Sequence, residues 1–138
     1  MKNLALIFIA TVSILAFSCR KTDKTTERFR LLTTVVWASD SLLANGVDAS
    51  QPGGMLVNLK GDARFKEDGT GTFGDYTGTW RFNSDETKLT ITSSALIIPM
   101  ITTDVKELTA TSLKITTSFT NPLAPGTPVN IRMTFKAK

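Results

Sequence analysis

The sequence predicts an all-β fold, a single antiparallel meander β-barrel of about eight strands, and three observations carry this prediction. Apolar and polar residues alternate with a period of two along most of the chain, as they do in half-buried strands. Short turn sequences, among them Asp68-Gly69 and Asn83-Ser84, separate the alternating segments. No long helical pattern intervenes, which excludes a fold built from parallel β-α-β units.

The expected strands follow one another, mostly through short connections. The first is expected from Thr33 to Trp37, because this segment is β-branched and aromatic. A long connection with a helical turn near Ser41 is expected over residues 39–54. A closed barrel would hide every edge of this meander, and a β-sandwich with crossing connections at 39–54 and 94–101 is the alternative. Further strands are expected within residues 55–60, 63–66, 71–73, 79–82, 89–92, 105–109, 113–119 and 129–136.

Length and composition indicate one globular domain. The chain has 138 residues, of which 41% are hydrophobic and 20% charged, so it can bury a real core. Its net charge of +4 is too dilute to indicate nucleic-acid binding, because basic residues alternate with acidic ones and cluster no further than Arg20-Lys21. The sequence carries no signal for an oligomeric state.

The N-terminal region has the features of a lipoprotein signal peptide. A basic start precedes an apolar run from Leu4 to Phe17, which is shorter than the roughly 20 residues needed to span a bilayer. The stretch that ends at Cys19 resembles a lipobox, and no second cysteine exists to pair with it. An ordinary cleaved signal and an uncleaved anchor are the alternatives. We expect a lipoprotein signal peptide at 1–18, a lipidated Cys19 with a polar tether at 19–28, and a barrel domain at 29–138.

The sequence contains few of the residues that enzymes use for catalysis. The chain has no histidine, and lipidation of Cys19 would remove its only thiol, so the usual bases, nucleophiles and transition-metal ligands are missing. The neighbouring carboxylates Glu67/Asp68 and Asp85/Glu86 lie in expected turns, where solvated hairpin tips are the commoner interpretation. We therefore expect no enzyme, no cofactor and no metal site.

The stretch DGTGTFGDYTGTWRF, residues 68–82, contains the Gly69-x-Gly71-x-x-Gly74 spacing of a dinucleotide-binding loop. That fingerprint needs a helix directly after the loop, whereas strand sequence follows here. The better interpretation is a hairpin unit used twice, because Thr-Gly-Thr-aromatic occurs in two copies. Gly71 and Gly78 are then expected to bend the sheet.

Large apolar residues on the expected strands are the candidate ligand-binding residues. They would line the interior of an open barrel, and would pack against one another in a filled one. The run from Ala95 to Ile101, which Pro99 breaks, is either a buried strand end or an exposed apolar rim at the barrel mouth. The candidate lining residues are Trp37, Phe65, Phe73, Trp80, Phe82, Ile91, Phe119 and Phe135.

Several short motifs, in this order and spacing, carry a family resemblance: Leu31-Leu32-Thr33 followed by Trp37, residues 65–71, residues 78–83, Leu89-Thr90-Ile91 and Met133-Thr134-Phe135-Lys136. On these motifs the chain resembles the lipocalin-like domains found in small lipoproteins of Bacteroidota, over about residues 29–138. In typical lipocalins a first-strand Gly-x-Trp is covered by an Arg near the last strand. In this chain Val35 stands where the Gly before Trp37 would be, and the Gly-x-Trp motif occurs instead at Gly78-Thr79-Trp80. Arg132, on the expected last strand, is the candidate residue to cover a Trp.

The resemblance implies a membrane-anchored lipoprotein whose lipocalin-like barrel binds a small apolar or amphipathic ligand. The alternative is a filled barrel, an interaction or structural module of the cell envelope that binds a protein or glycan through loops 39–54 and 120–128. A continuous cavity of a few hundred Å3 would support the first, and a solid interior the second. Surface-exported lipoproteins of this group resemble one another in having acidic residues after the cysteine. Because Arg20-Lys21 are basic, we expect an outer-membrane lipoprotein that faces the periplasm.

Overall fold

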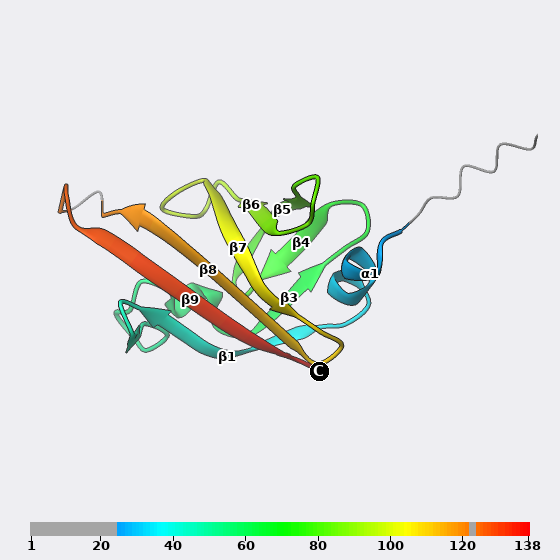
Figure 1. The fold of residues 1–138 in the computed structure, drawn as a ribbon. Helices are drawn as coiled ribbons and strands as arrows, with labels where there is room; N and C mark the ends of the chain where they lie inside the picture. The colour runs from blue at the N-terminus through cyan, green and yellow to red at the C-terminus, as the bar shows by residue number, and fades with distance from the viewer. Residues whose placement is uncertain (1–24, 122–123) are drawn as a thin grey trace, which may run out of the picture.

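The chain forms a closed antiparallel β-barrel (Figure 1). The computed structural model describes residues 25–121 and 124–138, so the expected signal peptide at 1–18, Cys19 and most of the expected tether lie outside the described residues. Within the described ranges, eight strands follow one another around the barrel, and a short extra strand, β2 (Val47–Asp48), pairs with β1. The eight are β1 (Trp37–Ala44), β3 (Asp62–Phe65), β4 (Thr70–Phe73), β5 (Tyr76–Phe82), β6 (Lys88–Thr92), β7 (Met100–Leu108), β8 (Ser112–Thr120) and β9 (Pro128–Ala137).

The first and last of these strands close the barrel. β1 pairs with β9 along its whole length, from Trp37 opposite Ala137 to Ala44 opposite Ile131. Each of the other strands is hydrogen-bonded to its neighbours in the chain. The prediction of an all-β meander barrel of about eight strands is therefore confirmed, and the sandwich alternative is wrong.

The N-terminal end of the domain is helical, where the sequence predicted a strand. Helix α1 covers Glu27–Thr33, and the Thr26 hydroxyl caps it by accepting a hydrogen bond from the Phe29 amide at 3.1 Å. Residues 27 and 28, which we had expected in the tether, form the first turn of this helix. The strand expected from Thr33 begins only at Trp37. The cap and the burial of Leu32 outweigh the β-branched tail of the segment.

Two further segments at the other end differ from the expectation. Residues 39–44 belong to β1 and are not part of a long connection, and Asn45 and Gly46 make a tight turn with φ of 50° and 80°. The segment expected as a strand at 55–60 contains instead a 3-10 helix, η1 (Val57–Leu59). The carbonyl of Asn58 in η1 accepts a hydrogen bond of 2.8 Å from the Asp75 amide, so this segment is fastened to the β4–β5 turn.

Aspartates organise three of the turns in the same way. In each, one aspartate oxygen accepts hydrogen bonds from the backbone and the hydroxyl of the residue two positions later, as in Asp68 with Thr70 at 2.9 and 2.6 Å. Asp48 with Ser50 and Asp85 with Thr87 repeat the pattern. Hydrogen bonds to the ionised form lower a carboxyl pKa. Those from Gln51 and Ser50 lower the pKa of Asp48 to about 2, and those from Thr70 and Thr87 lower the pKa values of Asp68 and Asp85.

The repeated Thr-Gly-Thr unit forms the β4–β5 hairpin, whose register is uninterrupted, with Gly71 directly opposite Gly78. A side chain at Gly71 would meet the Arg64 carbonyl and the Phe73 ring, which covers the glycine. A side chain at Gly78 would collide with the Thr92 carbonyl on β6. The two glycines therefore allow close approach of neighbouring strands, and the ladder between them has no bulge.

Candidate functional site

One end of the barrel is sealed by aromatic residues and by α1. The Trp80 ring lies 5.4 Å from Phe29 of the helix, 5.6 Å from Phe65 and 5.7 Å from Phe82, measured between ring centroids. The indole nitrogen of Trp80 donates to the Lys66 carbonyl at 2.9 Å. We call this the closed end. The rings are packed against one another, which leaves no room for a ligand among them, and the indole nitrogen already has its hydrogen-bond partner.

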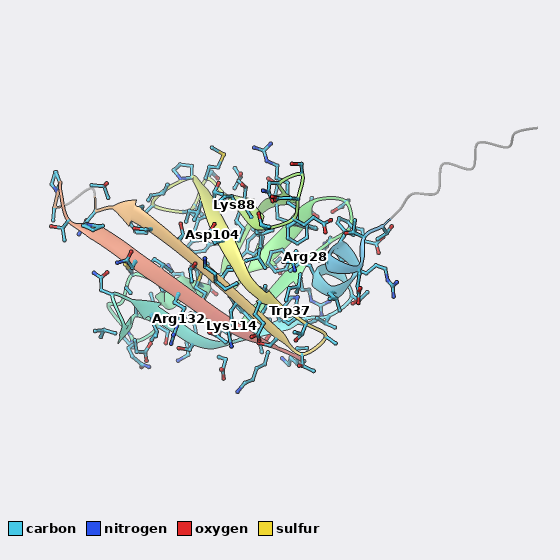
Figure 2. The ribbon with its side chains drawn as sticks, viewed as in Figure 1. Arg28, Trp37, Lys88, Asp104, Lys114 and Arg132 are labelled. Atoms are coloured by element: carbon cyan, nitrogen blue, oxygen red, sulfur yellow. The ribbon has the colours of Figure 1, made fainter. Side chains whose placement is uncertain are left out.

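Trp37 belongs to the closed end and Arg132 does not. Trp37 is 0% exposed, and its indole nitrogen donates to the Leu32 carbonyl of α1 at 3.0 Å. Arg132 is opposite Leu43 on β1, six residues along the strand from Trp37, and is exposed on the outer face (Figure 2). The helix therefore covers Trp37, and the lipocalin pairing of this Trp with Arg132 is absent.

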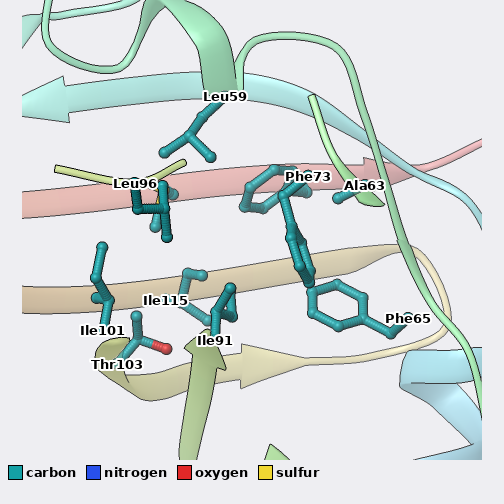
Figure 3. A pocket seen from close by; sticks show the side chains of 11 residues that line it. Leu59, Ala63, Phe65, Phe73, Ile91, Leu96, Ile101, Thr103 and Ile115 are labelled. Carbon is teal, nitrogen blue, oxygen red and sulfur yellow. The ribbon is translucent and has the colours of Figure 1, made fainter. Parts of the chain in front are cut away.

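The interior of the barrel is almost filled. It holds a cavity of about 30 Å3, roughly the room of one water molecule (Figure 3). Phe65 and Phe73 bound the cavity on one side, and Leu59 and Leu96 bound it on another. A cavity of a few hundred Å3 that runs through the barrel is not present among the described residues, so a ligand enclosed deep inside has no place there.

A larger apolar groove opens at the other end of the barrel, which we call the open end. Its volume is about 200 Å3. Four residues line both the groove and the small inner cavity, and so form the partition between them: Leu59, Leu96, Ile101 and Met133. The remaining walls come from the segment before η1, from the β6–β7 connection, from β5, β8 and β9, and from the residue that follows β8: Met55, Leu56, Tyr76, Ile97, Ile98, Thr117, Phe119, Asn121 and Ile131.

The polar groups of the groove are few and uncharged. The Tyr76 hydroxyl accepts a hydrogen bond from the side-chain amide of Asn58 at 3.2 Å. The Thr117 hydroxyl donates to the Thr102 carbonyl at 2.8 Å. Such a surface can hold an apolar molecule through burial and can offer it a hydrogen bond.

The structure divides the candidate lining residues into three groups. Phe65, Phe73, Ile91 and Phe135 line the small inner cavity. Phe119 lines the groove. Trp37, Trp80 and Phe82 line neither, because they pack at the closed end. Most of the proposed ligand contacts of the barrel are thus core contacts.

Sequence reasoning missed most of the groove, because its lining is aliphatic and comes from segments distant in the chain. The alternation over residues 55–60 predicts a strand for Met55 and Leu59, and no sequence pattern marks Tyr76. The one signal that pointed to the site is the run from Ala95 to Ile101, for which an exposed apolar rim was one of two interpretations. Ile97 in this run is 74% exposed and borders the groove.

The described residues contain no cluster of three or more His, Cys, Asp or Glu side chains that could hold a metal ion. None of the helices in this part of the chain is long and apolar enough to cross a membrane.

The chain matches no protein-family model and no curated protein. The candidate site therefore rests on the geometry of the groove.

Proposed function

We propose that the protein is a membrane-anchored lipoprotein whose barrel binds a small apolar or amphipathic molecule, without catalysis, in the groove at its open end. The observation that carries the proposal is the groove of about 200 Å3 with its aliphatic walls. An engineered apolar cavity of about 150 Å3 binds benzene, so this groove accommodates a ligand of similar or slightly larger size. The ligand is held at the mouth and stays partly exposed.

Occupation of the groove is tested by a matched pair of tryptophan variants. Leu96→Trp places a large ring in the partition between the groove and the inner cavity. Ala95→Trp places the same ring one position earlier, on an exposed residue that lines neither. In a titration with an apolar fluorescent probe, wild type and Ala95→Trp should bind and Leu96→Trp should not. Equal binding by both variants would place the probe outside the groove.

The lipoprotein part of the proposal rests on the apolar leader and on Cys19, the only cysteine. We propose anchoring in the outer membrane with the domain facing the periplasm, on the strength of the basic residues after Cys19. Cys19→Ala should release the protein from the membrane fraction of cells that carry it. Unchanged association of this variant with membranes would contradict lipidation. Labelling of the protein on intact cells would show that the domain faces outward, and would contradict the periplasmic orientation.

A second candidate function follows from the nearly filled interior. Among the described residues, the exposed large hydrophobic side chains are Val47, Met55, Ile97 and Met100, and all four lie at the open end. An apolar rim of this kind also suits an interaction module that binds another envelope component. Replacement of Val47 and Met100 by serine, neither of which lines the groove, should abolish a protein contact and should leave probe binding in place.

A further inference from the structure

Charged residues are almost absent from the segments that surround the groove. Residues 92–103 and 115–131 contain no Asp, Glu, Lys or Arg, and residues 41–59 contain only Asp48, although 20% of the whole chain is charged. These segments supply every lining residue of the groove except Tyr76 and Met133. The ion pairs of Lys88 with Asp104 and of Lys114 with Glu107 involve no residue that lines the groove.

The charged residues that neighbour the lining residues in sequence do not line the groove, and Arg132, between Ile131 and Met133, is exposed on the outer face. Asp48 accepts hydrogen bonds from Ser50 and Gln51, which already satisfy its carboxylate. Lys60, beyond η1, and Asp75, in the β4–β5 turn, are exposed to water. A carboxylate bound in the groove would therefore find no cation in contact, and an ammonium group would find no anion. An ion moved from water into apolar surroundings without a partner is strongly disfavoured.

The groove can satisfy a neutral polar group. Because the Tyr76 hydroxyl accepts from Asn58, its own proton remains to be donated to a ligand oxygen. The proton of the Thr117 hydroxyl is already used by the Thr102 carbonyl. The phenol is therefore a donor that suits the oxygen of an alcohol, an ester or a ketone.

We propose that the groove selects an electrically neutral ligand, an apolar body of about eight non-hydrogen atoms with an oxygen acceptor, over carboxylates and ammonium ions of the same length. This inference rests on the proposed function and adds the chemical class of the ligand. The aliphatic partition of Leu59 and Leu96 receives the apolar body, and Tyr76 receives the oxygen.

The test compares n-octanol, n-octanoate and n-octylammonium on the full chain. The protein is placed in phosphatidylcholine nanodiscs, and free ligand concentrations are measured against empty nanodiscs. Methionine methyl groups labelled with 13C give a local signal, because Met55 and Met133 line the groove and Met100 is close to it on the rim. Octanol should shift the Met55 and Met133 signals with a Kd at least about tenfold below those of the two ions at pH 7.5.

Two variants assign this selectivity to its cause. Tyr76→Phe should weaken octanol several-fold and should leave n-octane unchanged, because only octanol uses the phenol proton. Lys60→Gln should change none of the affinities, because Lys60 does not line the groove. Affinity for octanoate that falls in this variant would show that Lys60 reaches the ligand, and would overturn the inference.

The outcomes separate the two proposals. Equal or tighter binding of octanoate or octylammonium at the same methyl groups would overturn neutral selectivity and leave the groove as a binding site. Binding of none of the probes, octane included, would remove the proposed function itself. Unchanged affinity for octanol in Tyr76→Phe would contradict the donor role of the phenol.

Discussion

The two ends of this barrel are built from different side chains. At the closed end, α1 and the aromatic rings around Trp80 fill the space, and the indole of Trp37 is hydrogen-bonded to the helix. At the open end, aliphatic side chains from connecting segments leave a groove of about 200 Å3, and Ile97 and Met100 point into solvent. Packed rings whose indole nitrogens are hydrogen-bonded close one end of the barrel, whereas aliphatic walls at the other end leave room for an apolar ligand.

If the groove binds its ligand as proposed, binding and stability are separated along the barrel axis. Residues that look like ligand contacts because they are large and aromatic stabilise the closed end. Of the residues that form the groove, Met55 and Ile97 are exposed, so they contribute less to folding. Substitutions at the two ends should therefore have opposite profiles, with large losses of stability at the closed end and losses of binding at the open end.

The largest effect is expected for Trp37→Ala. The substitution empties a fully buried site and leaves the Leu32 carbonyl without its indole partner. We expect the free energy of unfolding to fall by about 3–5 kcal/mol, measured by urea denaturation. A loss below 1 kcal/mol would show that the helix does not depend on this contact, and would remove the distinction between the two ends.

Removal of the helix cap should have a smaller effect at the same end. The Thr26 hydroxyl caps α1 and also donates to the Glu86 carboxylate in the β5–β6 turn. Thr26→Ala should lower the free energy of unfolding by about 1 kcal/mol. Thr26→Ser retains the hydroxyl and is the matched control, so an equal loss in both variants would exclude capping as the cause.

Acid should affect the turns at both ends. The pKa values of Asp68 and Asp85, at the closed end, and of Asp48, at the open end, are all lowered by hydrogen bonds to the ionised carboxylate. A lowered pKa in the folded state stabilises it above the ordinary value of 3.8, and this contribution is lost as pH falls towards the folded pKa.

These three carboxyl groups should therefore leave the urea concentration at the unfolding midpoint unchanged above about pH 5. Below about pH 4 they should lower it. Asp48→Asn should remove the part of the decline that lies between pH 3.8 and about 2. An unchanged pH profile in this variant would show that the hydrogen bonds from Gln51 and Ser50 persist in the unfolded chain or contribute nothing.

The smallest effect is expected at the rim. Ile97 is 74% exposed, so Ile97→Ser removes little buried surface. The free energy of unfolding should change by no more than about 0.5 kcal/mol. A loss above 2 kcal/mol would mean that the open end belongs to the folding core and that the two ends do not differ in this way.

Much of the barrel could be predicted from the sequence, because strands such as β3, β6 and β9 alternate and tight turns such as that at Asp68 separate the strands. Helix α1 escaped prediction because it has only seven residues and runs into a β-branched tail. Its Phe29 packs against Trp80, which is distant in sequence, so the local pattern does not show what stabilises the helix. The groove escaped because Met55, Leu96 and Met133 meet only when the barrel closes.

Native mass spectrometry of the full chain isolated from its own cells tests the central claim most directly. We predict a small neutral adduct on wild type and on Ala95→Trp, and loss of that adduct in Leu96→Trp. Retention of the adduct in Leu96→Trp, or bare chain mass in wild type and both variants, would contradict ligand binding in the groove at the open end.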